Sequence, residues 1–157
     1  MQTSTSNTSV AGGVGEAWAK VAAFASAVDA GLDKWLADEH RVGLTEFRAL
    51  SFVSRASDKE LRVNDLAQRV GLSQSSATRL VSRLEAKGLA RRDVCEDDGR
   101  GVYAVITEQG EAMLNEVREP YEDRVRALLE ETSQHFPHLD ARQLGPALDE
   151  VRALITP

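Results

Sequence analysis

The residues from Ser73 to Gly88 form a predicted helix with two chemically different faces. Its apolar face has helical spacing and would pack against neighbouring helices; it consists of Ala77, Leu80, Val81 and Leu84. The opposite face consists of Ser73, Gln74, Ser75, Ser76, Thr78, Arg79, Ser82 and Arg83. Amides, hydroxyls and guanidinium groups in this order can donate hydrogen bonds to phosphate oxygens and to base edges. The chemistry available to this face is therefore non-covalent contact with nucleic acid.

Two strand-like runs follow this helix, Leu89 to Val94 and Val102 to Ile106. Between them lies CEDDGRG, in which the glycines permit a tight turn. Arg100 would lie at the tip of this turn, where its guanidinium group could enter a minor groove. Asp98 could hold that arginine extended by a charge-assisted hydrogen bond. The alternative is an ordinary surface ion pair worth at most about 1 kcal/mol.

A shorter helical pattern precedes the polar helix, with Leu66, Ala67 and Val70 on one face. Gly71 can take a positive φ and reverse the chain, and Ser73 can cap the next helix. The order helix, turn, helix, strand, strand predicts a winged helix-turn-helix, whose second helix enters the major groove of DNA. A merely solvated helix surface is the alternative, which the wing, the cap and the arginine spacing together disfavour.

The run from Leu66 through Thr107 resembles the MarR family of winged-helix regulators. The resemblance is carried by LEAKGL, by Asp98-Gly99-Arg100 and by GVYAVIT-x-x-G. It implies a homodimeric, DNA-binding transcription regulator with a pseudo-palindromic operator, usually a repressor. It also implies frequent release by a small phenolic or other amphipathic ligand, or by oxidation. Peroxide-sensing members carry their cysteine near the N-terminal helix, and this chain has only Cys95, beside acidic residues that discourage a thiolate.

Length and charge agree with this interpretation. A chain of 157 residues corresponds to one domain. Its net charge of -6 is unusual for a nucleic-acid-binding protein, but Ser73 to Arg92 contains five basic residues and one acidic residue, a local net charge of +4. DNA responds to charge within a Debye length of about 8 Å. One cysteine, no membrane-length apolar run and no leader pattern predict a cytoplasmic protein.

Helical patterns flank the predicted module, so we expect a mainly α fold with a small β wing. The expected organisation is a disordered tail (1–13) and a single domain (14–157), with the winged module at about 45–107 and dimerisation helices at about 14–40 and 108–157. The first helix carries one long apolar stripe with little core to cover, which favours packing against a second chain. Packing only on its own domain is the alternative.

Four local features give further expectations. Thr45 should cap a helix that follows the first one, and Ser57 to Glu60 should form a polar loop. Pro120 should kink or split the helix that follows the wing, because it lacks a backbone donor. Asp140 should open a last helix.

An effector pocket should lie where the first helix meets the winged module. Trp35, His40, Phe47 and Phe52 supply aromatic side chains near that junction, although core packing is the alternative for each. His135 and His138 have no third metal ligand nearby, so no metal and no cofactor are expected.

No catalytic constellation is apparent in the sequence, so an enzyme is not expected. The alternative function is a winged-helix module that only contacts other proteins. The polar helix face disfavours it, because interaction surfaces favour exposed Tyr, Trp, Met or Leu there.

Overall fold

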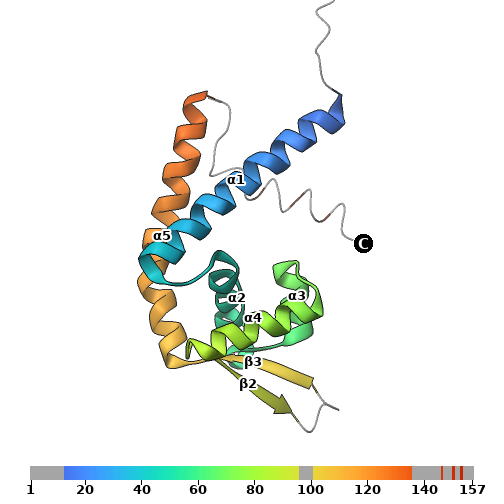
Figure 1. The fold of residues 1–157 in the computed structure, drawn as a ribbon, viewed down its shortest axis with the longest axis vertical. Helices are drawn as coiled ribbons and strands as arrows, with labels where there is room; N and C mark the ends of the chain where they lie inside the picture. Colours follow the sequence, from blue (N-terminus) through green and yellow to red (C-terminus); the bar gives the residue numbers. More distant parts are fainter. Residues whose placement is uncertain (1–12, 96–100, 136–145, 147–149, 151–152, 154–157) are drawn as a thin grey trace, which may run out of the picture.

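The computed structural model describes residues 13–95 and 101–135, with the single residues 146, 150 and 153. Predictions for the tail up to residue 12, for Asp98 and Arg100, and for the start of a last helix at Asp140 lie outside these residues. The described elements are α1 (Val14–His40), α2 (Leu44–Arg55), a 3-10 turn η1 (Ser57–Lys59), β1 (Glu60–Arg62), α3 (Val63–Val70), α4 (Gln74–Ala86), β2 (Ala90–Cys95), β3 (Gly101–Ile106) and α5 (Glu108–His135). The expectation of a mainly α fold with a small β wing is confirmed (Figure 1).

The three described strands form one antiparallel sheet in the order β1-β3-β2. Strands β2 and β3 are the two predicted strands of the wing. Strand β1 was not predicted, because the sequence indicated only a polar loop ending at Glu60. Instead, Leu61 lies opposite Ala104 and β1 completes the second side of β3. A strand of three residues is too short to show an alternating pattern, and its partner lies far along the chain.

The core lies between α2, α3 and α4 and is closed by parts of α1, α5 and the sheet. The predicted apolar face of α4 is wholly buried, with every member at most 1% exposed. On α2, Phe47, Leu50 and Val53 are also buried. Helix α4 is therefore fixed along one side and presents only its polar side.

Local hydrogen bonds and turns set the ends of three helices, and those at Gly71 and Ser73 were predicted. Gly71 takes a φ of 75° at the C-terminus of α3. Ser73 Oγ accepts a hydrogen bond from the Ser76 amide at 3.2 Å and caps α4. Thr107 Oγ1 accepts one from the Gly110 amide at 3.1 Å at the start of α5. These contacts fix where the helix-turn-helix reverses and where the wing passes into α5.

The start of α2 differs from the prediction. The helix begins at Leu44, so its N-cap is Gly43 and not Thr45. The Gly43 amide donates to Glu46 Oε2 at 3.0 Å, and the Leu44 amide donates to Asp33 Oδ1 of α1 at 2.8 Å. Two carboxylates, one of them from another helix, thus satisfy the first amides of α2, which begins one residue before Thr45.

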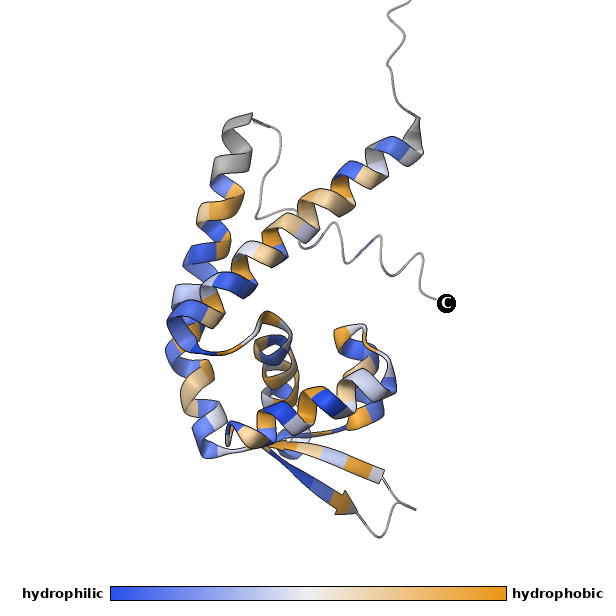
Figure 2. Ribbon diagram, in the orientation of Figure 1, coloured by the Kyte–Doolittle hydropathy of each residue, from blue (hydrophilic) through white to orange (hydrophobic). Residues whose placement is uncertain are grey.

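Helices α1 and α5 extend beyond the winged module as two diverging rods (Figure 1). The inner half of α1 (residues 28–40) packs on the core through Leu32 and Leu36, which are 2% and 0% exposed. The outer half (residues 14–27) carries apolar residues along its length (Figure 2). Its large exposed side chains are Trp18, Val21 and Phe24, at 70%, 54% and 40% exposure.

Helix α5 continues through Pro120 without interruption. Of the predicted kink or split at Pro120, the split is therefore wrong. Proline removes one backbone donor, and Tyr121 and Val125 beyond it pack against the core, which compensates for that loss.

Candidate nucleic-acid interface

The polar face of α4 is accessible along the whole helix. Its exposed members are Ser73, Gln74, Ser75, Thr78, Arg79 and Arg83, and the half-buried ones are Ser76 and Ser82. All eight predicted contact residues on this helix therefore lie on its uncovered side or at that side's edge. Their backbone is held rigidly by the buried apolar face beneath them.

The hydroxyl groups of this face are engaged within α4. Ser73 Oγ donates to Ser76 Oγ at 3.0 Å. Thr78 Oγ1 donates to the Gln74 carbonyl oxygen and Ser82 Oγ to the Thr78 carbonyl oxygen, each at 3.0 Å. A hydroxyl that donates to its own helix keeps its oxygen lone pairs as acceptors. In this arrangement, Thr78 presents an acceptor to an approaching ligand, whereas Ser82 Oγ already accepts from the Arg92 guanidinium group.

The two arginines of the face have different surroundings. Arg79 Nε lies 3.4 Å from the Ser75 carbonyl oxygen one turn earlier, which is a long contact within its own helix. Arg83 Nε lies 3.5 Å from Glu46 Oε1 of α2. Arg83 is therefore anchored to a neighbouring helix.

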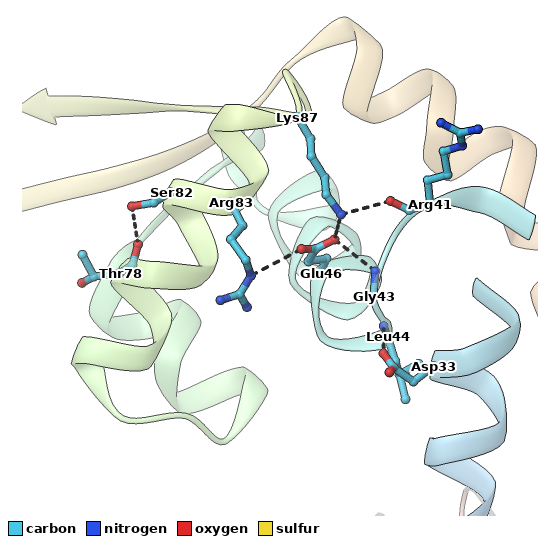
Figure 3. Close-up of polar contacts among 9 residues, drawn as sticks. All are labelled: Asp33, Arg41, Gly43, Leu44, Glu46, Thr78, Ser82, Arg83 and Lys87. Carbon is cyan, nitrogen blue, oxygen red and sulfur yellow. Dashed lines mark hydrogen bonds and ion pairs between the residues drawn. The ribbon is translucent and has the colours of Figure 1, made fainter. Parts of the chain in front are cut away.

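Glu46 forms the centre of a polar cluster between α1, α2 and α4, which we call the Glu46 cluster (Figure 3). Besides Arg83 and the Gly43 amide, its carboxylate contacts Lys87, whose Nζ lies 2.6 Å from Oε2. The same Nζ donates to the Arg41 carbonyl oxygen at 3.0 Å. Sequence reasoning missed Glu46, and its only local signal is its position three residues after the cap at Gly43.

Arg92 links the wing to α4. Its guanidinium group contacts Ser82 Oγ and its Nε lies 3.5 Å from Glu85 Oε2. The wing is therefore held beside the polar face. In the same wing, Val94 of β2 lies opposite Val102 of β3, and both are exposed.

A pocket of about 360 Å³ lies between α2, α3 and α5. Its lining consists of Phe47, Arg48, Ser51, Phe52, Arg55, Arg69, Val70 and Tyr121. The structure thus brings Phe47 and Phe52 to one cavity. Trp35 and His40 lie outside this lining and contact each other edge to face, with ring centroids 5.0 Å apart.

The α1 side of this region is fixed by a bidentate ion pair. Arg48 donates to both carboxylate oxygens of Asp29, at 2.8 and 3.0 Å. The hydrogen bonds to Asp29 are the main reason that the pKa of Arg48 is raised above its ordinary value. This pocket-lining guanidinium group therefore stays charged and connects α1 to α2.

Within the described ranges, no group of three or more His, Cys, Asp or Glu side chains is arranged to hold a metal ion. None of the described helices has the length and apolar character needed to cross a membrane.

A polar helix backed by core, a glycine turn before it and a β hairpin packed beside it define a winged helix-turn-helix. The model of the MarR family matches residues 42–101, which contain the winged module. The chain is similar to the solved structure of Sco3205, a MarR family transcriptional regulator from Streptomyces coelicolor, in complex with DNA. The two are 25% identical with a TM-score of 0.75, over 90% of this chain and 86% of that one.

A second similar structure is that of AbsC, a MarR family transcriptional regulator from Streptomyces coelicolor. It is 26% identical with a TM-score of 0.70, over 90% of this chain and 97% of that one. No curated protein matches the sequence. The coverage includes the flanking helices, so the similarity extends beyond the winged module.

Proposed function

We propose that this chain is a sequence-specific DNA-binding transcriptional regulator, with α4 in the major groove and the wing in the minor groove. The observation that carries the proposal is the polar face of α4, which offers amide, hydroxyl and guanidinium groups above a wholly buried apolar face. The local charge of +4 between Ser73 and Arg92 supports it. The DNA complex of the similar Sco3205 supports it as well.

Selection of fragments from a genomic pool, followed by fluorescence anisotropy, tests this function. Arg79→Ala should lower discrimination between operator variants if Arg79 reads a base, since a bidentate contact is worth about 1 to 3 kcal/mol. Equal loss on every duplex would identify a phosphate contact. If no fragment is selected and binding is absent even at low salt, the proposal fails and a protein-protein module becomes the better explanation.

The wing residues Asp98 and Arg100 form the second part of this proposal. We assign Arg100 to the minor groove and Asp98 to holding the arginine extended. Asp98→Ala should then weaken DNA binding although it removes a negative charge, and simple electrostatics predicts the opposite sign. The double variant should lose less than the sum of the single ones. Tighter binding by Asp98→Ala would exclude the assignment.

We also propose a homodimer, in which residues 14–157 act as one domain and 1–13 as a tail. The outer half of α1 supports it, since Trp18, Val21 and Phe24 are exposed on a helix that the described part of the chain leaves uncovered there. A two-fold dimer would present two copies of α4 to a pseudo-palindromic operator. Light scattering should give about twice the chain mass of 17.1 kDa, and a monomer at micromolar concentration would contradict the dimer.

We further propose that the regulator is a repressor released by a small amphipathic or phenolic ligand. The pocket beside Phe47 and Phe52 supports this, because its lining combines aromatic side chains with the arginines Arg48, Arg55 and Arg69. Trp35 and His40 stay candidates for ligand contact through movement of α1. A panel of phenolic compounds should release the operator from the wild-type protein and not from Phe52→Ala. Release that is equal in both proteins would place the ligand elsewhere.

The regulator is proposed to act in the cytoplasm by binding alone, without catalysis and without a cofactor. The polar side of α4 offers no cluster of exposed Tyr, Trp, Met or Leu side chains that would suit a protein partner instead. Regulator activity is measured as reporter expression from the selected operator, with and without the protein. Repression should be lost with Arg79→Ala if that residue reads the operator.

A further inference from the structure

We infer that Glu46 is a positioning residue for DNA recognition, which orients Arg83 and couples the end of α1 to the recognition helix α4. The inference rests on the proposed DNA-binding function and deepens it. Glu46 is not on the DNA-reading face, and its effect on binding is exerted through the two cations that it holds.

The surroundings of Glu46 are unusual for a charged side chain. At 6% exposure it is the one buried charged or polar residue among those that the structure describes. A buried carboxylate is costly unless hydrogen bonds and opposite charges satisfy it. Both of its oxygens are used, Oε1 by Arg83 and Oε2 by Lys87 and the Gly43 amide. The carboxylate therefore has little freedom to move and can act as a fixed reference point.

Arg83 is held in a way that leaves its binding groups accessible. The contact to Glu46 uses Nε, and the remainder of the guanidinium group points away from the carboxylate (Figure 3). The two terminal nitrogens carry the donors that can engage a phosphate or a guanine edge side by side. Because the side chain is already restrained, less conformational entropy is lost when it binds.

Lys87 extends the connection to α1. Its Nζ bridges Glu46 and the carbonyl oxygen of Arg41, the C-cap of α1, whose φ is 57°. The Lys87 ammonium group thus lies at the negative end of the α1 dipole. The backbone of Lys87 forms the C-cap of α4. A displacement of α1 relative to α2 would stretch one of the two Lys87 contacts. Such a displacement would therefore alter the seat of α4 and the direction of Arg83.

The decisive test separates geometry from charge. Glu46→Asp keeps the negative charge and shortens the side chain by one methylene. It should lower the affinity for the selected operator about tenfold, and the affinity for a scrambled duplex of equal length by less than about twofold. Glu46→Gln removes a negative charge, which electrostatics alone predicts will tighten binding to both duplexes. Under our inference it should weaken operator binding selectively.

Asp65→Asn is the matched control for charge. Asp65 is exposed on α3 and contributes nothing to the Glu46 cluster. Its neutralisation should therefore change the affinity for both duplexes by the same factor. If Glu46→Gln behaves like Asp65→Asn and Glu46→Asp like the wild type, Glu46 is only a nearby charge and the inference is overturned. Circular dichroism and thermal unfolding of each variant exclude loss of fold as the cause.

Lys87→Gln provides a second test if a Glu46 variant does not fold, since Lys87 is 40% exposed by side chain and outside the core. Loss of a simple phosphate contact would weaken binding to both duplexes equally, and this result would overturn the inference. Preferential loss on the operator supports it. Failure of the wild-type protein to bind DNA would instead contradict the proposed function itself, so the two failures are distinguishable.

Discussion

The winged module and the outer half of α1 contain similar apolar side chains in opposite surroundings. In the module, Leu66, Leu80 and Leu84 are at most 1% exposed, whereas Trp18 on the outer half of α1 is 70% exposed. A fully buried side chain of this kind contributes about 1.5 to 3 kcal/mol, and an exposed one contributes nothing until another surface covers it. The module is therefore stabilised by its own chain, whereas the described residues leave the large apolar side chains on the outer half of α1 exposed.

The largest effect should come from the core of the module. Leu80 is fully buried on α4, so Leu80→Ala should lower the free energy of unfolding by about 2 to 5 kcal/mol through lost burial and a residual cavity. Urea unfolding followed by circular dichroism measures this. A loss below about 1 kcal/mol would mean that α4 is not seated as described.

The outer half of α1 should respond in the opposite way. Trp18→Glu should weaken dimerisation at least about tenfold, because it places a charge in the proposed interface, while the thermal stability of the module changes little. Sedimentation across a concentration series measures the dimer. Ala23→Glu is the control, since Ala23 is exposed and lies about 140° around the helix from Trp18. Equal behaviour of the two variants would place the interface elsewhere.

A smaller effect is expected at the N-terminus of α4. Ser73→Ala should destabilise the module by about 1 kcal/mol, because the Ser76 amide loses its acceptor. Ser75→Ala is the control, because it removes the hydroxyl 3.2 Å from Ser73 Oγ but leaves the bond from the Ser76 amide to Ser73 in place. Comparable losses in thermal stability for the two variants would argue against the cap.

The smallest effect should occur where α5 joins the module. The hydrogen bond from Lys59 is the main cause of the lowered pKa of Glu111, and Ser54 adds to it against an opposing effect of partial burial. When folding lowers the pKa of a carboxyl group, the ionised group stabilises the fold at pH values above its ordinary pKa of 4.5. This contribution is lost as the pH falls through the lower pKa of the folded state. The gain at neutral pH should be below about 1 kcal/mol.

Glu111→Gln tests this contribution. The variant should be less stable than the wild type at pH 7, and the difference should vanish at acidic pH, where Glu111 is protonated in both states. Thermal unfolding across a pH series measures it. A stability difference that is independent of pH would show that the amide disturbs packing and that the charge of Glu111 is not responsible.

Local features of the fold could be predicted from the sequence. The periodicity of α4, the cap at Ser73 and the turn at Gly71 each depend on residues within one or two helical turns, so sequence spacing was sufficient. The same holds for the wing strands. Helix α1 was also predicted from its apolar stripe, although the stripe could not show which half its own chain would cover.

Features that depend on distant residues could not be predicted. The amide of Leu44 is capped by Asp33 from another helix, so the local preference for Thr45 was misleading. Glu46 is a surface residue by type and becomes buried only because α2 and α4 meet there. Likewise, Tyr121 reaches the pocket from α5, and no local pattern links it to Phe47. Side-chain placement between helices was therefore the missing information.

The pairing of β1 with β3 has a consequence for the order of folding. Leu61 lies opposite Ala104, so α3, α4 and β2 are all enclosed by the loop that this pairing closes. Closing a loop costs entropy before its contacts repay it, and a three-residue strand repays little alone. We therefore expect β1 to join after α3 and α4 have docked. Its paired amide protons should then exchange with solvent through local detachment of β1, faster than those in the core of α4.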